Sequence, residues 1–171
     1  LIQTDDKNAD VINGISVYTY KNISSAKIYG LETLYTDQLF DRIFFNASHT
    51  YTNAKNGETN QTLTRRPEHI ARIGLDFDLS DRWQLITRAR YQSKELASSG
   101  DYSLTNTPST WSPSWVTLDI KTNYQLTPAT TVFAGVDNIT NRQRDFSTGQ
   151  DFGPIIGRFM YLGFEIKTQF F

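Results

Sequence analysis

The sequence contains no cysteine and only two histidines. Without cysteine there are no disulfide bonds, no thiolate metal sites and no cysteine nucleophile. Two histidines argue against a zinc or haem centre built from imidazole ligands. The charge balance, 17 Lys and Arg against 18 Asp and Glu, provides no basic footprint for nucleic acid. We therefore expect no metal site, no bound cofactor and no nucleic-acid partner.

Long apolar runs and catalytic motifs are also missing. No segment approaches the roughly 18 consecutive apolar residues of a transmembrane helix. There is no glycine-rich phosphate loop, no nucleophile elbow and no clustering of histidine with carboxylates. We therefore expect no catalytic residues and a protein that is not an enzyme. Aromatic residues, in contrast, make up 13% of the chain, and membrane barrels carry aromatic girdles at both interfaces.

The dominant pattern is a two-residue alternation of apolar and polar side chains. In the last segment, one side of an extended strand would carry Met160, Leu162, Phe164 and Ile166, and the other would carry Tyr161, Gly163, Glu165 and Lys167. Similar alternation covers residues 27–39, 43–53, 69–80, 83–92 and 114–126. No window of comparable length has a helical period, so we predict an all-β chain of strands and turns.

The connections between these strands alternate in length. Tight links, "DQLFDR", "LSDR" and "LTPAT", alternate with long polar stretches, "AKNGETNQT", "SKELASSGDYSLTNTPSTWSP" and "NRQRDFSTGQDFGPIIG". Short turns at one end and long loops at the other are typical of outer-membrane barrels. The same parity makes 6–14 another long loop and 15–37 one very long strand. We count about eight meandering strands, the first a stub at 1–4, and the C-terminus falls on the periplasmic side.

Two other architectures fit part of this pattern. A soluble β-sandwich, acting as a ligand-binding module, also has alternating strands joined by hairpins. Long charged residues on the polar faces, and connections that differ systematically at the two ends, count against it. A complete eight-stranded barrel is a permitted size. The stub at 1–4 is too short to close such a barrel, so the chain reads as the last part of a larger one.

Four segments, in order, resemble the TonB-dependent outer-membrane receptors. The residues that carry the resemblance are Asn22, Ala26, Gly30, Glu32, Tyr51 and Thr52, then Pro67 and His69, then Val136, Asn138 and Asn141, and finally Gly157 and Arg158. Such chains end on an aromatic residue in phase with the apolar face. Here Phe170 is in phase and Phe171 lies one residue beyond, which leaves the register at the end of the last strand open.

The resemblance implies a 22-stranded transmembrane barrel around an N-terminal plug domain. Residues 1–171 would be a single partial domain, the C-terminal part of the barrel, with the plug absent. The implied function is uptake of an iron–siderophore complex into a bacterial cell across its outer membrane, driven by TonB through the absent plug. Haem or cobalamin receptors of the same family are alternatives. The implied partners are the lipid bilayer, lipopolysaccharide, a ferric siderophore and, secondarily, a bacteriocin or phage.

Ligand contacts are expected mainly in the long loops. Arginine and aromatic side chains suit flat anionic ligands, and the candidates are Tyr102, Trp111, Arg142, Arg144 and Phe146. Trp115 is open to either ligand contact or anchoring at the membrane interface. Charges predicted to face the lumen are either structural or part of a basic track for an anionic complex; they are Arg72, Arg88, Arg90, Lys121 and Glu165. His49 and His69 are expected to be structural.

Overall fold

The computed structural model describes residues 7–12, 15–20, 25–98, 110–144 and 155–168, with the backbone alone for the first two ranges. These residues form eleven strands: β1 Lys7–Ile12, β2 Ile15–Tyr20, β3 Ala26–Phe40, β4 Ile43–Asn56, β5 His69–Ser80, β6 Trp83–Gln92, β7 Glu95–Ser98, β8 Thr110–Ser112, β9 Trp115–Thr127, β10 Thr130–Asp137 and β11 Phe159–Ile166. Among these residues there is no helix of the length and apolarity that crossing a membrane requires. The all-β prediction is confirmed.

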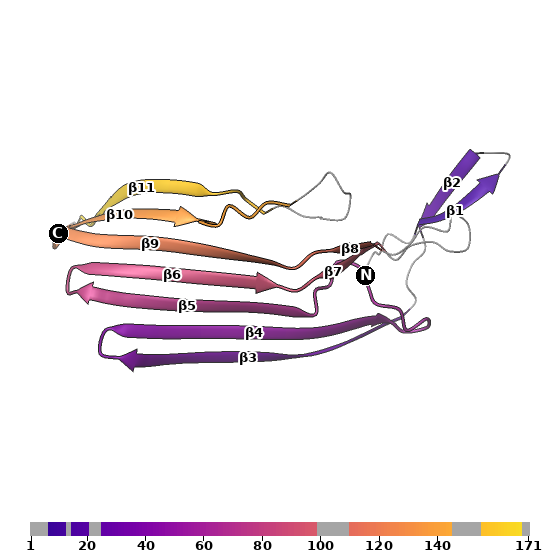
Figure 1. The fold of residues 1–171 in the computed structure, drawn as a ribbon, viewed down its shortest axis with the longest axis horizontal. Coiled ribbons are helices and arrows are strands. Elements are labelled where there is room, and N and C mark those ends of the chain that lie inside the picture. The colour runs from indigo at the N-terminus through magenta and orange to yellow at the C-terminus, as the bar shows by residue number, and fades with distance from the viewer. Residues whose placement is uncertain (1–6, 13–14, 21–24, 99–109, 145–154, 169–171) are drawn as a thin grey trace.

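Seven of the strands form one antiparallel meander in the order β3-β4-β5-β6-β9-β10-β11. Each strand pairs with its neighbours along the chain, except that the small β7–β8 hairpin is inserted between β6 and β9. Figure 1 shows the seven strands side by side as one long sheet. The predicted meander is therefore confirmed over seven strands, and the predicted stub at 1–4 lies outside the described residues.

The prediction of a single strand over 15–37 is wrong. Residues 15–20 form β2, which pairs with β1 in a separate two-stranded sheet, while β3 begins only at Ala26 and continues to Phe40. The register pairs Ile12 with Ile15, so only Asn13 and Gly14 separate the two strands. Asn-Gly is the preferred sequence of a two-residue hairpin. β2 is thus paired with β1 and with no described strand of the large sheet, which separates it from β3. The prediction of a long loop over 6–14 is also wrong, because residues 7–12 form β1.

Short and long connections lie at opposite ends of the sheet, as predicted. Residues 41–42, 81–82 and 128–129 join β3 to β4, β5 to β6 and β9 to β10 at one end, which we call the turn end. The described parts of the longer connections, 57–68, 93–98, 110–114, 138–144 and 155–158, lie at the other end, the loop end (Figure 1). At the turn end Arg42 and Asp81, from neighbouring turns, form an exposed ion pair of 2.7 Å.

The sheet has one polar and one apolar face. Cross-strand partners point to the same side, so the register places the charged residues of β5, β6 and β9 together and their apolar neighbours on the reverse. Many large apolar side chains on that reverse face are exposed, among them Leu31, Ile73, Val116, Leu162 and Phe164. Leu162 is 77% exposed. Covering such a side chain with hydrocarbon is favourable by about 1.5–3 kcal/mol.

Buried apolar side chains gather at the loop end. Within the described residues they are Ala54, Leu63, Leu96 and Trp115. The loop backbones are joined there, because the Leu63 N–H donates to the Ala54 carbonyl at 3.0 Å and the Arg65 N–H donates to the Leu96 carbonyl at 2.8 Å. A sandwich would instead bury the apolar face of its sheet under a second sheet. The described sheet is a single layer, which argues against the sandwich.

Candidate functional site: the polar face and its loop end

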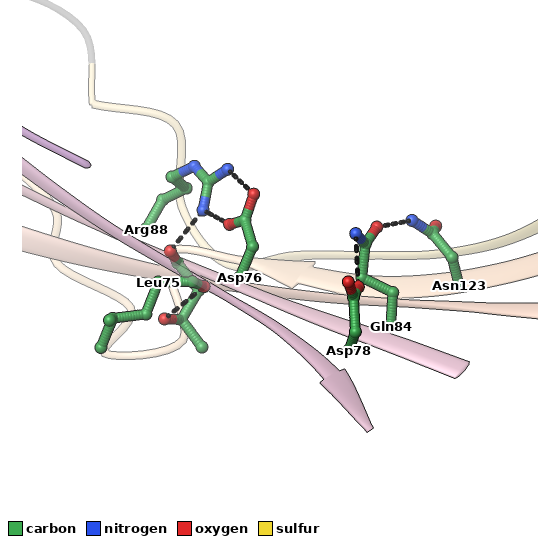
Figure 2. A network of polar contacts seen from close by, with 7 residues as sticks. Leu75, Asp76, Asp78, Gln84, Arg88 and Asn123 are labelled. Carbon is green, nitrogen blue, oxygen red and sulfur yellow. Dashed lines mark hydrogen bonds and ion pairs between the residues drawn. The ribbon is translucent and has the colours of Figure 1, made fainter. Parts of the chain in front are cut away.

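The polar face carries an ion pair at its centre. Arg88 of β6 donates from both terminal guanidinium nitrogens to both carboxylate oxygens of Asp76 in β5, with Nη2 and Oδ2 3.0 Å apart (Figure 2). Two-point contact of this kind fixes the direction of the guanidinium as well as its position. The register sets Arg88 opposite Gly74 and Asp119, and the missing side chain of Gly74 leaves room for Asn46.

A second pair of cations lies one step closer to the loop end. Arg72 of β5 and Arg90 of β6 are directly opposite each other on the polar face. Like charges in this arrangement repel, and no ion pair relieves either of them among the residues that the structure describes. Together with Asn46, Ser48 and Asp119 they line a depression of about 350 Å³. The result is a cationic hollow on this face, open to a negatively charged group.

Closer still to the loop end, the ring of Trp115 contacts two arginine side chains. The guanidinium of Arg90 lies 5.1 Å from the ring centroid and that of Arg144, from the connection after β10, lies 5.7 Å away. Arg144 also approaches Glu95 of β7 at 3.9 Å, and the two side chains are only 5% and 12% exposed. Cation–π contacts are strongest when desolvated. This cluster connects the sheet to two of the long connections.

Towards the turn end the polar face changes from cations to amides. Gln84 of β6 donates to Asp78 at 3.2 Å and accepts from Asn123 of β9 at 3.1 Å, so it links three adjacent strands (Figure 2). Because each group has a partner, this part of the face is satisfied within the sheet. Arg72 and Arg90 lie nearer the loop end than this amide group.

Asn138, at the end of β10, organises the last long connection. Its backbone N–H donates to the Asp119 carboxylate at 2.7 Å. Its side-chain amide donates to the carbonyls of Arg142 and Ile156, both at 2.8 Å, and its oxygen accepts from the Arg142 N–H at 2.9 Å. The residue is 4% exposed and has a φ of 49°, a left-handed conformation that Asn tolerates. It therefore joins Arg142 and Ile156, from the two described ends of the connection between β10 and β11.

The last two strands add aromatic rings to the polar face. Phe133 of β10 lies beside Gly163 of β11, and Tyr161 of β11 lies beside Gly135 of β10. The ammonium group of Lys121 stands 5.1 Å from the Phe133 centroid. Glycine opposite an aromatic residue gives the ring space to lie flat on the sheet. This part of the polar face is thus apolar at its surface, with one cation held against it.

A comparison with protein-family models decides the family. Residues 1–139 match the model described as TonB dependent receptor-like, beta-barrel. The chain belongs to the TonB-dependent receptors. The match includes every strand of the seven-stranded sheet except β11, and the family is one of outer-membrane transport receptors, which fits a protein that is not an enzyme.

Among curated proteins, the iron-regulated outer membrane virulence protein of Vibrio cholerae serotype O1 is 26% identical over 153 residues. The alignment covers 86% of the present chain and 22% of the Vibrio protein. The chain thus spans about a fifth of the length of that relative. An outer-membrane location is supported by this relative and by the family.

Solved receptors share the fold. A mutant of the ferric enterobactin receptor PfeA of Pseudomonas aeruginosa, in complex with enterobactin, has a TM-score of 0.70 and 22% identity over 90% of this chain and 24% of its own. The siderophore receptor PirA of Acinetobacter baumannii has a TM-score of 0.69 and 19% identity over 94% and 25%. The copper transporter OprC has a TM-score of 0.65 and 21% identity over 82% and 23%. These likenesses establish the barrel-wall fold of the segment.

Three of the five ligand-contact residues predicted in this receptor segment lie in the described chain. Trp111 is in β8, where it is 42% exposed and lies 5.0 Å from the Lys94 ammonium. Arg142 is fixed through its backbone by Asn138. Arg144 is buried against Trp115 and Glu95. Tyr102 and Phe146 lie outside the described residues, and ligand contact by all five stays a prediction.

The membrane-anchor interpretation of Trp115 is wrong. The register pairs Trp115 with Gln92 on the polar face, and its ring is buried near two guanidinium groups rather than exposed on the apolar side. Glu32 and Asp37 lie on opposite faces of β3, because their partners Thr50 and Phe45 lie on opposite sides of β4. The five predicted lumen-side charges share one face, as their register shows.

Sequence reasoning missed two pairings. His49 and His69, from β4 and β5, stack on the apolar face with Nε2 and Nδ1 3.1 Å apart. The two residues are 20 positions apart, and only the strand register brings them together. The ring–glycine pairs of β10 and β11 were missed for the same reason. The sequence did contain a signal for these pairs. Gly135 and Gly163 occupy polar-face positions, and a glycine within a strand often marks a site where another group approaches the backbone closely.

Proposed function

We propose that this chain forms the C-terminal part of the barrel wall of a TonB-dependent receptor that imports an iron–siderophore complex. The observation that supports it is the two-faced sheet: an exposed apolar face for the bilayer, and a polar face with cations that run towards the loop end. A barrel lumen is polar while its outer band is apolar. The iron-regulated relative and the siderophore receptors that share the fold agree with it.

The proposed orientation places the loop end outside the cell and the turn end in the periplasm, since outer-membrane barrels have short periplasmic turns. Ile166, the last residue of β11, pairs with Thr130, next to the turn at 128–129. In this orientation β11 would end on the periplasmic side. TonB would act there through the plug domain of the receptor, and the Arg88–Asp76 pair would face that plug.

The proposed cargo is an anionic ferric complex. Arg72 and Arg90 have no ion-pair partner among the described residues and line the hollow below the loops, and arginine both pairs with oxygen anions and stacks on flat rings. Trp111, Arg142 and the two loop residues Tyr102 and Phe146 would make the first contacts outside. Bacteriocins or phage would use the same exposed loops as secondary ligands.

Growth under iron starvation tests the proposal. The full-length receptor would be expressed in a bacterial strain lacking its own siderophore receptors, in a TonB-containing and a TonB-deleted background. Supplied with an anionic ferric tris-catecholate, the TonB-containing strain is expected to grow and the deleted strain is not. Equal growth with and without the receptor would refute uptake of that complex. Growth only with haem, or only on cobalamin, would assign the receptor to the alternative cargo classes.

Variants of Arg72 and Arg90 test more specifically whether the cargo is anionic. Replacing Arg72 and Arg90 by glutamine is expected to lower uptake of the radiolabelled ferric tris-catecholate by about tenfold, the loss of one to two charge-assisted contacts. A neutral ferric hydroxamate, if it is carried at all, is expected to be affected less. Lys27→Gln, on the apolar side of β3, is the control. An equal loss for both complexes would point to a structural role of the pair instead.

A further inference from the structure

The two histidines of the sequence meet on the apolar face of the sheet. His49 of β4 and His69 of β5 are diagonal neighbours, since His49 pairs with Ala71 and His69 pairs with Tyr51. Diagonal neighbours on adjacent strands are within reach of each other when their side chains are large. The two imidazole planes differ by only 15°, and His49 Nε2 lies 3.1 Å from His69 Nδ1. The strand register therefore brings together two ring nitrogens from positions twenty residues apart.

This contact points two potential metal ligands at each other. A neutral imidazole has one N–H and one bare nitrogen, so one nitrogen of the contact donates and the other accepts. A metal ion could replace the proton between them, because that proton can move to the other nitrogen of its own ring and leave both imidazoles neutral. Imidazole nitrogens bind transition metals at about 2.0–2.1 Å, so two of them at a right angle stand about 3 Å apart. The observed separation is 3.1 Å.

Both rings are held in place by their surroundings. The Tyr51 ring lies against His69, with centroids 5.2 Å apart. The backbone N–H of His69 donates to the Ser93 hydroxyl at 3.0 Å, and its carbonyl accepts from the Ser93 N–H at 2.9 Å. The backbones of β4 and β5 are joined by the sheet ladder. The two nitrogens are therefore brought together before any ion arrives, which lowers the ordering cost of binding.

An open pocket gives access to one side of this pair. His69 lines a cavity of about 510 Å³ at the loop end, together with Glu68, Arg66 and Lys94. The cavity has room for water molecules at the coordination positions that the protein leaves open. Within the described residues no group of three or more histidines and carboxylates gathers to hold a metal, so the pair supplies two ligands. Two cations against one carboxylate in the cavity oppose a bound cation, and the expected affinity is moderate.

We propose that His49 and His69 chelate a divalent transition-metal ion, with Cu²⁺ preferred. Imidazole is a good ligand for copper, nickel and zinc, and copper binds most tightly in the general order of affinities. Nitrogens at a right angle suit the tetragonal geometry of Cu²⁺. Mg²⁺ and Ca²⁺ require oxygen ligands and would not bind. The ion joins β4 to β5 on the side of the wall away from Arg72 and Arg90, so import of a ferric complex does not use it.

The test is titration of the full-length receptor in detergent, free of any affinity tag, with Cu²⁺, Zn²⁺ and Ca²⁺. Calorimetry measures the affinity, and electron paramagnetic resonance of the Cu²⁺ complex counts its nitrogen ligands. His49→Gln and His69→Gln are each expected to bind Cu²⁺ at least about tenfold more weakly than the wild type at this site, because one of two ligands is lost. The spectrum is expected to change from two coordinated nitrogens to one.

Two further variants serve as controls. Tyr51→Phe keeps both imidazoles and the ring that lies against His69, so its affinity for Cu²⁺ is expected to equal that of the wild type. Arg66→Gln with Lys94→Gln removes two cations that line the same cavity as His69. This double variant is expected to bind Cu²⁺ about threefold more tightly, since the repulsion between like charges is reduced.

Equal Cu²⁺ affinity in the wild type and in both glutamine variants would overturn the proposal and leave the histidine pair as a structural hydrogen bond. Binding of Ca²⁺ as tight as that of Cu²⁺ would also overturn it, because Ca²⁺ does not use imidazole ligands. Should a glutamine variant fail to fold, judged by heat-modifiable migration in gels, the phenylalanine variant at the same position replaces it. Phenylalanine keeps a ring on the apolar face and removes the ligand nitrogen.

Discussion

The backbone of Gly30 in β3 lies directly against the carbonyl oxygen of Tyr51 in β4: a Cβ on Gly30 would stand 2.2 Å from that oxygen. Nothing can relieve this contact except movement of one strand against the other, because the obstructing atom belongs to the backbone. Gly135 differs. A Cβ there would meet the far end of the Tyr161 ring at 2.4 Å, and the ring can turn aside.

Gly30→Ala is therefore expected to destabilise the full-length receptor by about 1–3 kcal/mol, the usual range for overpacking. Gly135→Ala, the matched control, is expected to cost less. Urea-induced unfolding in detergent micelles, followed by tryptophan fluorescence, measures both. If both variants lose the same free energy of unfolding, the contact with a backbone oxygen is no more costly than the contact with a movable ring, which contradicts the prediction.

Arginine substitutions distinguish the two faces. Leu75→Arg or Leu118→Arg is expected to cost about 2–4 kcal/mol in a lipid bilayer, because these positions would lie near mid-membrane on the apolar face. Asn123→Arg, on the polar face of the same strand as Leu118, is expected to cost much less. The measurement is the folding equilibrium in phospholipid vesicles. Similar costs at all three positions would contradict the assignment of the apolar face to lipid.

Two substitutions at Asn138 separate the contribution of its side-chain hydrogen bonds from the cost of its left-handed backbone conformation. Asn138→Ala removes the hydrogen bonds to Arg142 and Ile156 and leaves a left-handed φ that alanine disfavours by about 1–2 kcal/mol. Asn138→Gly removes the same bonds without that conformational cost. We expect both variants to be cleaved faster by protease within 139–157 on intact cells, the alanine variant fastest. Wild-type cleavage rates in both would mean that the connection is held by other contacts.

Arg144 is expected to connect the last long connection to the β7 strand. Arg144→Gln removes a cation from the Trp115 ring and the ion pair with Glu95. Amide hydrogen exchange in 95–98 should then rise by about fivefold, the effect of losing roughly 1 kcal/mol of local stability. Arg142→Gln is the control, since the backbone of Arg142 carries its bonds to Asn138. Faster exchange in Arg142→Gln but not in Arg144→Gln would show that Arg142, and not Arg144, stabilises β7.

Much of the sheet was accessible from the sequence because alternation with a period of two is a local property. The strands, their faces and the unequal connections at the two ends all follow from it. The pairing of β1 with β2 is an exception: Asn13-Gly14 is a typical hairpin sequence, but the alternation of short and long connections predicted a loop over 6–14 and one strand over 15–37. The burial of Trp115 was missed because the phase of a residue next to a turn was given less weight than its aromatic character.

The candidate site also has features that the sequence predicted and features that it did not. Arg72, Arg88 and Arg90 were placed on the correct face from their positions alone. Their different roles were not predictable, because a partner such as Asp76, twelve residues away, is chosen by the register between β5 and β6. Aromatic and basic residues in the loops were identified as a class. The burial of Arg144, in contrast to the exposure of Trp111, depends on how separate loops pack.

By itself the sequence determined the all-β class, the two faces and the alternation of short turns with long connections, since each depends on neighbours along the chain. The tertiary structure alone decided which charges are paired, which arginines share a hollow and which loop residues are buried. These depend on strand register, and a shift of one residue would move every side chain of a strand to the other face.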